Sequence, residues 1–313
     1  MIVRQRRDMP FITVQEAAKA WKVSEDTVRK LLREGKIEGA DKQGKYWHIP
    51  SLAISPFIEE KIGTTGRFQL PKGYFDKLFD LHEVLNSKKP LPQGKLRSLK
   101  EHFNLLWTYN SNALEGNTLT LSETQVVLEG ITIGGKTIKE HLEVNGHEKA
   151  ILCLDELVKQ SNPINGRNIK NIHHTLLNEI DREHAGMYRN ENVLLSKSNH
   201  IPPDYTIVTE KMERLVEEYK TWEQYNPIIK AAILHEELVK IHPFIDENGT
   251  VARLVMNLSL MKDDFLPVII RKEERNKYYT ALQEADEGDY TNLIKLMTAS
   301  EIGIMETYLK LLK

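Results

Sequence analysis

Ile241-His242-Pro243-Phe244-Ile245-Asp246-Glu247-Asn248-Gly249-Thr250-Val251-Ala252-Arg253 is the stretch that says most about the fold of this chain. Apolar residues recur at helical spacing before it, from Pro227 to Val239, and again after Thr250. The pattern predicts a helix, a short loop and a second helix. The loop then brings backbone N–H groups to the start of a helix, where an anion binds well.

Polar side chains in this stretch indicate chemistry on a nucleotide. His242 is a candidate base, and Asp246 is a carboxylate of the kind that binds a metal ion. Arg253 carries the planar guanidinium group that suits a phosphate. Together with the anion site at the helix start, these residues predict a site that handles phosphates.

Composition and charge set broad limits. Hydrophobic residues make up 40% of the 313 residues and charged residues 28%, which is ordinary for a soluble protein. A net charge of -2 argues against a chain that coats nucleic acid over its whole surface. Cys153 is the single cysteine, so no disulfide can form within the chain. The sequence has no apolar run of transmembrane length and no secretory leader pattern, so we expect a cytoplasmic protein with no membrane partner.

Residues 11–50 have the pattern of a small helix-turn-helix module. Thr13 and Glu16 form a capping box at the start of a first helix. Ser24 then precedes a second helix, which Gly35 ends. The segment therefore predicts two short helices joined by a tight turn.

A two-stranded wing is expected after these helices. Ile37 to Ala40 and Tyr46 to Pro50 would form the strands, with a turn at Gly44. With the two helices, this arrangement resembles the winged helix-turn-helix family of excisionases and MerR-type regulators. The resemblance implies a DNA-binding domain.

The DNA-contacting residues would lie on the second helix of this module. They are Arg29, Lys30 and Arg33. Residues 1–50 hold eleven Lys or Arg against seven Asp or Glu, a modest positive balance that suits contact with phosphates. A protein-interaction or dimerisation role for the module is the alternative.

Proline and glycine mark the boundaries of the remaining chain. We assign residues 1–58 to the helix-turn-helix domain, 59–90 to a linker helix and 91–313 to a second domain. The second domain has helical periodicity almost throughout. The expected fold class is therefore mostly α.

Ser111-Asn112-Ala113-Leu114-Glu115-Gly116 is a second polar motif, placed between helical stretches. Thr120 and Glu123 then form a capping box for the next helix. Considered alone, Glu115 would be a solvated acid near a helix end.

A third motif, Gly130-Ile131-Thr132-Ile133-Gly134-Gly135-Lys136-Thr137, fits the Walker A pattern of a phosphate-binding loop. Such a loop follows a buried strand, whereas Gln125 to Glu129 has the pattern of a helix end. We therefore predict an ordinary loop between two helices.

The first two motifs together resemble those of the Fic family of nucleotidyl transferases. The family pattern is His-x-Phe-x-Asp/Glu-Gly-Asn-Gly-Arg-x-x-Arg, and self-inhibited members also carry Ser/Thr-x-x-x-Glu-Gly/Asn. The resemblance extends over residues 91–300, including Gly186-Met187-Tyr188-Arg189 and His200-Ile201-Pro202-Pro203. It implies a helical Fic fold with a β-hairpin flap, an inhibitory helix at about 106–117 and a Fido core at about 164–300.

The resemblance also implies catalytic roles for His242, Asn248 and Arg253. His242 would take the proton of a target hydroxyl as that hydroxyl attacks the α-phosphorus of ATP. Asn248, with the amides of residues 247–249, would stabilise developing charge. Arg253 would bind the outer phosphates, and Asp246 would hold Mg²⁺.

Further roles follow from the same resemblance. The inhibitory motif is Ser111, Glu115 and Gly116, with Glu115 paired to Arg253 so that ATP cannot settle with its α-phosphate in line. The nucleotide-binding residues would be Glu247, Asn248, Gly249, Thr250, Arg253, Tyr278 and Tyr279, the two tyrosines near the adenine. The flap that aligns the target peptide would be Val193, Leu194, Leu195 and Ser196.

Two positions depart from the family pattern. Glu247 stands where glycine is usual, which adds a negative charge where the backbone approaches a phosphate. Thr250 stands where the first arginine is usual, which removes a charge-assisted contact. We expect both changes to weaken triphosphate binding.

The expected function is protein adenylyltransferase, moving AMP from ATP with Mg²⁺ to a Ser, Thr or Tyr of a protein target, the chain itself included. A transcriptional regulator with a degenerate Fic domain is one alternative. A deAMPylase, in which Glu115 aligns the attacking water, is another. DNA is an expected second partner, and a homodimer stays open.

Overall fold

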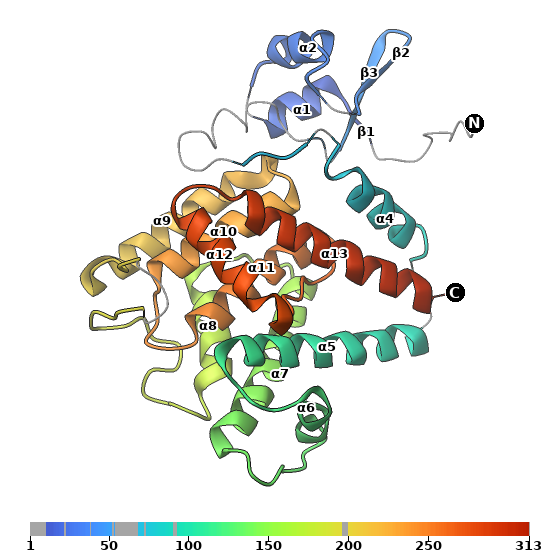
Figure 1. The fold of residues 1–313 in the computed structure, drawn as a ribbon. Coiled ribbons are helices and arrows are strands. Elements are labelled where there is room, and N and C mark those ends of the chain that lie inside the picture. The colour runs from blue at the N-terminus through green and yellow to red at the C-terminus, as the bar shows by residue number, and fades with distance from the viewer. Residues whose placement is uncertain are drawn as a thin grey trace.

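The computed structural model describes residues 11–21, 23–37, 39–51, 53, 68–71, 73–89, 93–195 and 200–312. It is mostly helical, as predicted, with a small three-stranded sheet near the N-terminus. Figure 1 shows the N-terminal helices and sheet beside a larger helical body. Over the described ranges, no helix combines the length and the apolar character needed to cross a membrane.

The N-terminal helices form where the capping residues predict them. Helix α1 (Val14–Ala20) has the Thr13–Glu16 capping box, and α2 (Glu25–Arg33) has Ser24 as its N-cap. Gly35 follows α2 with a φ of 66°, the left-handed conformation in which glycine commonly ends a helix. The module has a hydrophobic core of its own, which includes Ala17, Val28, Leu32 and Ile49.

The small sheet differs in part from the predicted wing. Its strands are β1 (Phe11–Ile12), β2 (Asp41–Gln43) and β3 (Tyr46–Pro50), in the order β1-β3-β2 with antiparallel pairing throughout. The prediction of β3 is confirmed. The prediction of a strand at Ile37 to Ala40 is wrong, because Ile37 turns inward to the core and the strand begins only at Asp41. Strand β1 was not foreseen, since two residues show no periodicity.

The helical body contains most of the remaining elements. Its helices are α4 (Asp76–Asn86), α5 (Gln93–Glu115), α6 (Leu121–Leu128), α7 (Ile138–Lys159), α8 (Gly166–Leu177), α9 (Val208–Lys220), α10 (Pro227–Ile241), α11 (Asn248–Lys262), α12 (Arg275–Asp286) and α13 (Thr291–Leu311). Short 3₁₀ turns lie at Tyr205–Ile207, Trp222–Gln224 and Lys272–Glu274. Helix α4 packs against α13, and its Leu78 and Leu85 belong to the main hydrophobic core.

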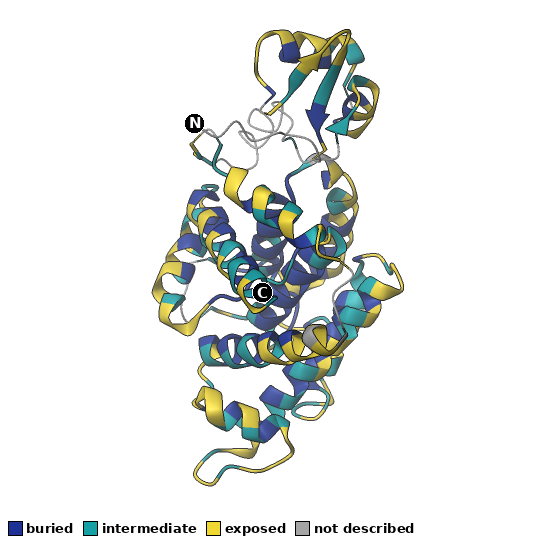
Figure 2. Cartoon of the chain, turned by 90° about the vertical axis from the view of Figure 1, so that its right-hand side faces the viewer, coloured by how far each residue is buried: buried dark blue, intermediate teal, exposed yellow. Residues whose placement is uncertain are grey.

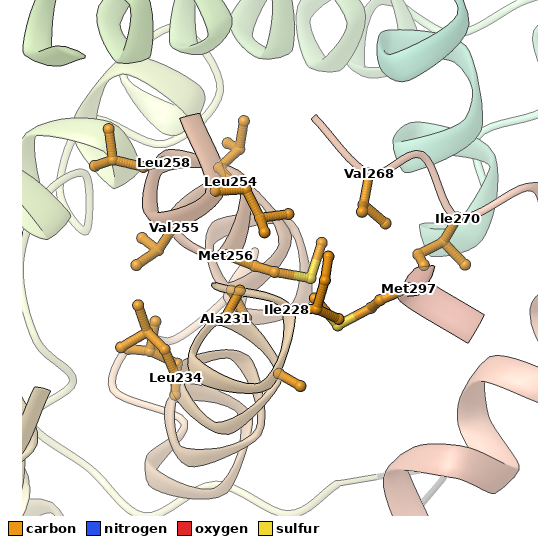
Figure 3. Close-up of a cluster of buried hydrophobic side chains, with 14 of the residues drawn as sticks. Ile228, Ala231, Leu234, Leu254, Val255, Met256, Leu258, Val268, Ile270 and Met297 are labelled. Atoms are coloured by element: carbon orange, nitrogen blue, oxygen red, sulfur yellow. The ribbon is translucent and has the colours of Figure 1, made fainter. Parts of the chain in front are cut away.

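Helices α10 and α11 lie at the centre of the body and are buried on almost every side. Figure 3 shows α10 and α11 side chains packed together and against Val268, Ile270 and Met297. Figure 2 shows that exposed residues gather on the outer helices instead. A loop between two such helices is held firmly at both ends, which suits a site that needs fixed geometry.

Three connecting segments bear on the sequence predictions. The Walker-like motif forms a loop between α6 and α7, with Thr137 as the N-cap of α7, which confirms the prediction. Residues 106–117 are the end of the longer helix α5 and the turn after it. Residues 192–195 and 200–204 contain no strand, so these described flanks do not pair as the expected flap hairpin. Ser196 and the rest of its tip, 196–199, lie outside the described residues.

Candidate active site

A pocket of about 300 Å³ opens beside the loop between α10 and α11. At one end it is lined by Glu115, His242, Asp246, Gly249 and Arg253. At the other end the lining comes from Glu236, Val239, Lys240, Leu282, Gln283 and Asp286. Tyr278, Tyr279, Leu194, Leu195 and His200 complete it. The structure thus brings five of the predicted site residues to one end of a single pocket.

The loop that carries His242 has two residues in the left-handed conformation. His242 ends α10 with a φ of 48°, and Glu247 precedes α11 with a φ of 59°. Residues other than glycine adopt this conformation rarely, and such strain concentrates at functional sites. The usual family glycine at position 247 is explained by this backbone conformation.

Asn248 holds the loop together rather than facing the pocket. Its Oδ1 accepts from the Phe244 N–H and its Nδ2 donates to the Phe244 carbonyl, both at 2.8 Å. Phe244 is fully buried. Among the predicted nucleotide-binding residues, Asn248, Glu247 and Thr250 do not line the pocket. For Asn248 the arrangement indicates a positioning role.

Two residues from outside the motif brace the same loop. The His173 ring stacks on Phe244 with 3.8 Å between ring centroids. Arg189 is buried, and its Nε donates to the His242 carbonyl at 2.9 Å, while its Nη1 and Nη2 donate to the carbonyls of Glu191 and Pro203. Arg189 therefore connects the flanks of segment 191–203 to the loop between α10 and α11.

The environment of His242 favours a neutral imidazole. Burial lowers the pKa of the His242 imidazole to about 4, with Arg189 acting in the same direction and Glu115 opposing it. The imidazole is then neutral at pH 7 and can accept a proton. Its position at the end of α10 places it in the lining of the pocket.

Arg253 is held by contacts with Glu115, Ser111 and Thr250. Its Nη1 pairs with Glu115 Oε1 at 2.8 Å, and its Nε donates to Ser111 Oγ at 3.1 Å. Its Nη2 donates to the Ser111 carbonyl at 3.1 Å and to Thr250 Oγ1 at 3.2 Å. Burial disfavours the charge of Arg253, but the nearby Glu115 carboxylate holds its pKa above the ordinary value. Ser111 and Glu115 are four residues apart on α5, so both face Arg253 from one side of that helix.

Glu115 occupies the anion site at the start of α11. A Cβ added to Gly249 would lie 2.6 Å from Glu115 Oε1, so only a glycine there lets the carboxylate approach this closely. Gly116 ends α5 with a φ of 110°, which allows the chain to turn away directly after Glu115. A carboxylate in this place competes with any phosphate that would bind the same helix start.

Glu247 and Thr250 stand where the family usually has glycine and arginine, and both interact with neighbouring residues of the site. Burial raises the pKa of the Glu247 carboxyl to about 7; Thr250 opposes this shift, and the carboxylates of Glu115 and Asp246 reinforce it. Thr250 Oγ1 accepts a hydrogen bond from Arg253 Nη2. The raised pKa lessens the negative charge of Glu247, so the weakening of triphosphate binding stays a prediction that rests mainly on the missing arginine at position 250.

Asp246 fits the role of a magnesium ligand shared with a nucleotide. Its side chain is exposed, and its Oδ1 accepts from the Glu247 N–H at 2.8 Å. Lys139 approaches Asp246 Oδ2 at 3.8 Å from α7. The described residues contain no group of three or more His, Cys, Asp or Glu side chains that could hold a metal ion. Mg²⁺ commonly binds through one or two carboxylates plus substrate phosphates, so a single carboxylate is sufficient here.

The two tyrosines expected near the adenine both line the pocket. Tyr278 is buried, and its hydroxyl bonds His235 Nε2 at 2.9 Å. Glu236, on α10, was not foreseen. Its only sequence signal is its place on the helix face that also carries Val239 and Lys240.

The predicted DNA-binding side chains are exposed on α2, and each has an intrahelical partner. Arg29 pairs with Glu25 at 2.6 Å, and Lys30 lies 4.0 Å from Glu34. Arg33 Nε donates to the Arg29 carbonyl at 3.1 Å. Acidic neighbours therefore partly neutralise this helix.

Comparisons with known proteins agree with this geometry. A model described as the Fic/DOC family matches residues 163–260, and a helix-turn-helix domain model matches residues 11–61. The solved structure of Fic-1 from C. elegans is 32% identical, with a TM-score of 0.66, and the match covers 75% of this chain and 71% of that one. This chain belongs to the Fic/DOC family.

Other Fic relatives extend the match. The protein adenylyltransferase Fic of Nematostella vectensis is 36% identical over 283 residues, which are 85% of this chain and 64% of that protein. That of Drosophila melanogaster is 34% identical over 273 residues, or 84% and 54%. A Fic-domain signaling protein from Bacteroides thetaiotaomicron has a TM-score of 0.70 at 25% identity, over 75% of this chain and 96% of that one. The chain spans between half and two thirds of the length of the Nematostella and Drosophila adenylyltransferases.

Proposed function

We propose that the chain is a protein adenylyltransferase held in an inhibited state by Glu115. The observation that carries the proposal is the 2.8 Å ion pair between Glu115 and Arg253, placed in the pocket that also contains His242 and Asp246. The adenylyltransferases among its relatives support the same reaction class. ATP is the proposed AMP donor, and a Ser, Thr or Tyr side chain is the proposed acceptor.

The reaction balances with the groups present. His242 takes the proton of the acceptor hydroxyl, whose oxygen forms a bond to the α-phosphorus of ATP. The bond from the α-phosphorus to the bridging oxygen breaks, and pyrophosphate leaves. Arg253 and the N–H groups at the start of α11 bind the phosphate oxygens. Mg²⁺ held by Asp246 would neutralise phosphate charge.

Inhibition follows from the place of Glu115. Its carboxylate lies against the start of α11 and uses one donor of Arg253, so it competes with a phosphate for both. Its side chain remains 36% exposed toward the pocket, whereas that of Arg253 is 4% exposed. The arginine is therefore fixed, and Glu115 is the partner that can move.

The test uses ATP labelled at the α-phosphate, with Mg²⁺, and three forms of the chain: wild type, Glu115→Gly, and Glu115→Gly/His242→Ala. Each is incubated alone, for intact-mass measurement, and with an extract of the source cells. Labelled protein is expected for Glu115→Gly alone. Label transferred by none of the three contradicts the proposal, and removal of AMP from labelled protein by the wild type would favour a deAMPylase instead.

The helix-turn-helix domain supports a second role in transcriptional regulation. Its match to a domain model and the exposed Arg29, Lys30 and Arg33 support DNA binding. AMP added to this domain would place negative charge near DNA phosphates. DNA binding that weakens after incubation with ATP would favour a link between the two activities, and unchanged binding would contradict it.

A further inference from the structure

The pocket extends beyond His242 into a slot between α10 and α12. One wall is the α10 face formed by Glu236, Val239 and Lys240, which are three and four residues apart. The other wall is formed by Leu282, Gln283 and Asp286 of α12. The slot thus combines apolar side chains with carboxyl groups.

The nucleobase would lie in this slot. Arg253 and the start of α11 lie at the other end of the pocket, where they attract phosphates, and Asp246 beside them would hold Mg²⁺. Glu236 lies six residues before His242 on α10, a separation of about 9 Å along the helix. A nucleotide whose α-phosphate lies beside His242 therefore extends its base toward Glu236.

Glu236 has a carboxyl group whose burial the fold does not explain. The residue is 1% exposed, and its Oε2 atom has no hydrogen-bond partner within the part of the chain that the structure describes. Buried polar groups in proteins almost always have a partner. Glu301 is a useful contrast, because its Oε1 accepts from the Leu266 N–H at 2.8 Å and so holds a loop. Glu236 lines the pocket and makes no such bond among the described residues.

The surroundings of Glu236 favour its neutral form. Burial raises the pKa of its carboxyl to about 8, with Asp286 and Glu237 acting in the same direction and Lys240 opposing them. The Tyr290 hydroxyl is a further titratable group beside it. A neutral carboxyl offers one hydrogen-bond donor and one acceptor side by side.

We propose that Glu236 binds the adenine base of the nucleotide, donating to N7 and accepting from the N6 amino group, and thereby selects adenine over guanine. Adenine presents an acceptor at N7 beside a donor at N6, which matches a neutral carboxyl. Guanine presents acceptors at both N7 and O6, so one oxygen of Glu236 would face an acceptor. The proposal rests on the proposed function, since it takes ATP as the bound nucleotide.

The test measures dissociation constants of ATP and GTP by calorimetry for the full chain, Glu236→Gln and Glu236→Leu. Glutamine keeps one donor and one acceptor, so Glu236→Gln should retain the preference for ATP. Glu236→Leu should bind ATP about 10-fold more weakly, as expected for about 1.4 kcal/mol. Its GTP affinity should change little, so the ATP-to-GTP preference should disappear.

Glu237→Leu is the matched control, because Glu237 is the adjacent acid on α10 and does not line the pocket. Thermal unfolding of each variant separates loss of folding from loss of binding. If Glu236 serves the fold rather than the nucleotide, Glu236→Leu should be less stable than the parent and its ATP-to-GTP ratio should be unchanged. An unchanged ATP-to-GTP ratio in Glu236→Leu would overturn the proposal.

The two proposals fail in different ways. ATP binding without AMP transfer contradicts the proposed function alone, and the Glu236 variants still test base selection. A chain that binds neither nucleotide even as Glu115→Gly contradicts both.

Discussion

Two arginine–glutamate pairs of similar length lie in different parts of the molecule. Arg253 and Glu115 are 2.8 Å apart in the helical body, and Arg29 and Glu25 are 2.6 Å apart on the N-terminal helix α2. The Arg253 side chain is 4% exposed and that of Arg29 is 47% exposed. Exposed pairs contribute about 0–1 kcal/mol to stability, whereas loss of one partner of a buried pair costs about 3–5 kcal/mol.

The difference shows that burial, more than distance, decides what an ion pair does. Arg29 can exchange Glu25 for a DNA phosphate at little cost, because water already surrounds both groups. Arg253 cannot be left without an anion in the same way. In the site, Glu115 is therefore held until another anion replaces it, and a nucleotide phosphate is such an anion.

The largest expected effect is on the rate of AMP transfer when His242, the proposed general base, is removed. In a Glu115→Gly background, His242→Ala should lower the rate of AMP transfer by about 10²–10⁴-fold, the usual contribution of a general base. ATP affinity should change little, because the imidazole acts on the acceptor hydroxyl. Rates of label incorporation and ATP titrations check both points. Equal rates with and without His242 would remove it from the mechanism.

Neutralising each glutamate compares the two pairs directly. Glu115→Gln should lower the free energy of unfolding by about 1–3 kcal/mol, since Arg253 loses its charged partner and Glu115 is partly exposed. Glu25→Gln should change it by less than about 1 kcal/mol. Urea unfolding of both variants measures the difference. Equal losses would show that burial does not distinguish the pairs.

Glu247 tests the backbone strain beside the buried pair. Glu247→Gly should stabilise the fold by up to about 1 kcal/mol, because glycine adopts the left-handed conformation without steric cost. Glu247→Ala keeps the Cβ and removes the rest of the side chain, so it serves as the control. If both variants unfold at the same urea concentration, strain is not the cause.

A substitution on the exposed helix α2 should change the salt dependence of DNA binding and leave the stability of the fold unchanged. Arg33→Ala should lower the slope of log affinity against log salt concentration for duplex DNA by about 1, as expected for the loss of one phosphate contact. Its thermal unfolding should match that of the wild type. Anisotropy titrations at several salt concentrations measure the slope. An unchanged slope would exclude Arg33 from the DNA contact.

The smallest expected effect is a nearly flat pH profile. Burial lowers the pKa of His242 to about 4, so the neutral base persists well below pH 6.5. The transfer rate of Glu115→Gly should therefore change less than about twofold between pH 6 and pH 7.5. Because the folded pKa is depressed, His242 should destabilise the fold as pH falls from about 6.5 toward 4. A rate that halves near pH 6.5 would contradict an imidazole in this environment.

Local signals in the sequence were sufficient for much of the fold. The capping residues Thr13, Ser24 and Thr120 mark helix starts because their side chains bond nearby N–H groups, and all three act as predicted. The strand expected at Ile37 to Ala40 is absent because Ile37 is buried in the core of the module instead. A tertiary contact of that kind has no local pattern.

The site residues likewise divide into those that local spacing predicts and those that depend on tertiary contacts. The spacing of His242, Asp246 and Arg253 was sufficient to place them together, because one loop and one helix turn carry all three. The bracing roles of Asn248 and Arg189 could not be predicted, since they depend on which carbonyls the folded chain brings within reach. Glu236 could not be predicted, because what distinguishes it is a buried Oε2 atom without a hydrogen-bond partner among the described residues.

The most direct test of the account compares AMP transfer by the wild type, Glu115→Gln and Glu25→Gln under identical conditions. The buried pair should control the site, so Glu115→Gln should transfer AMP at least about 10-fold faster than wild type, which corresponds to about 1.4 kcal/mol. Glu25→Gln should equal the wild type. Equal transfer by all three forms would contradict the claim that the Glu115–Arg253 pair holds the enzyme inactive.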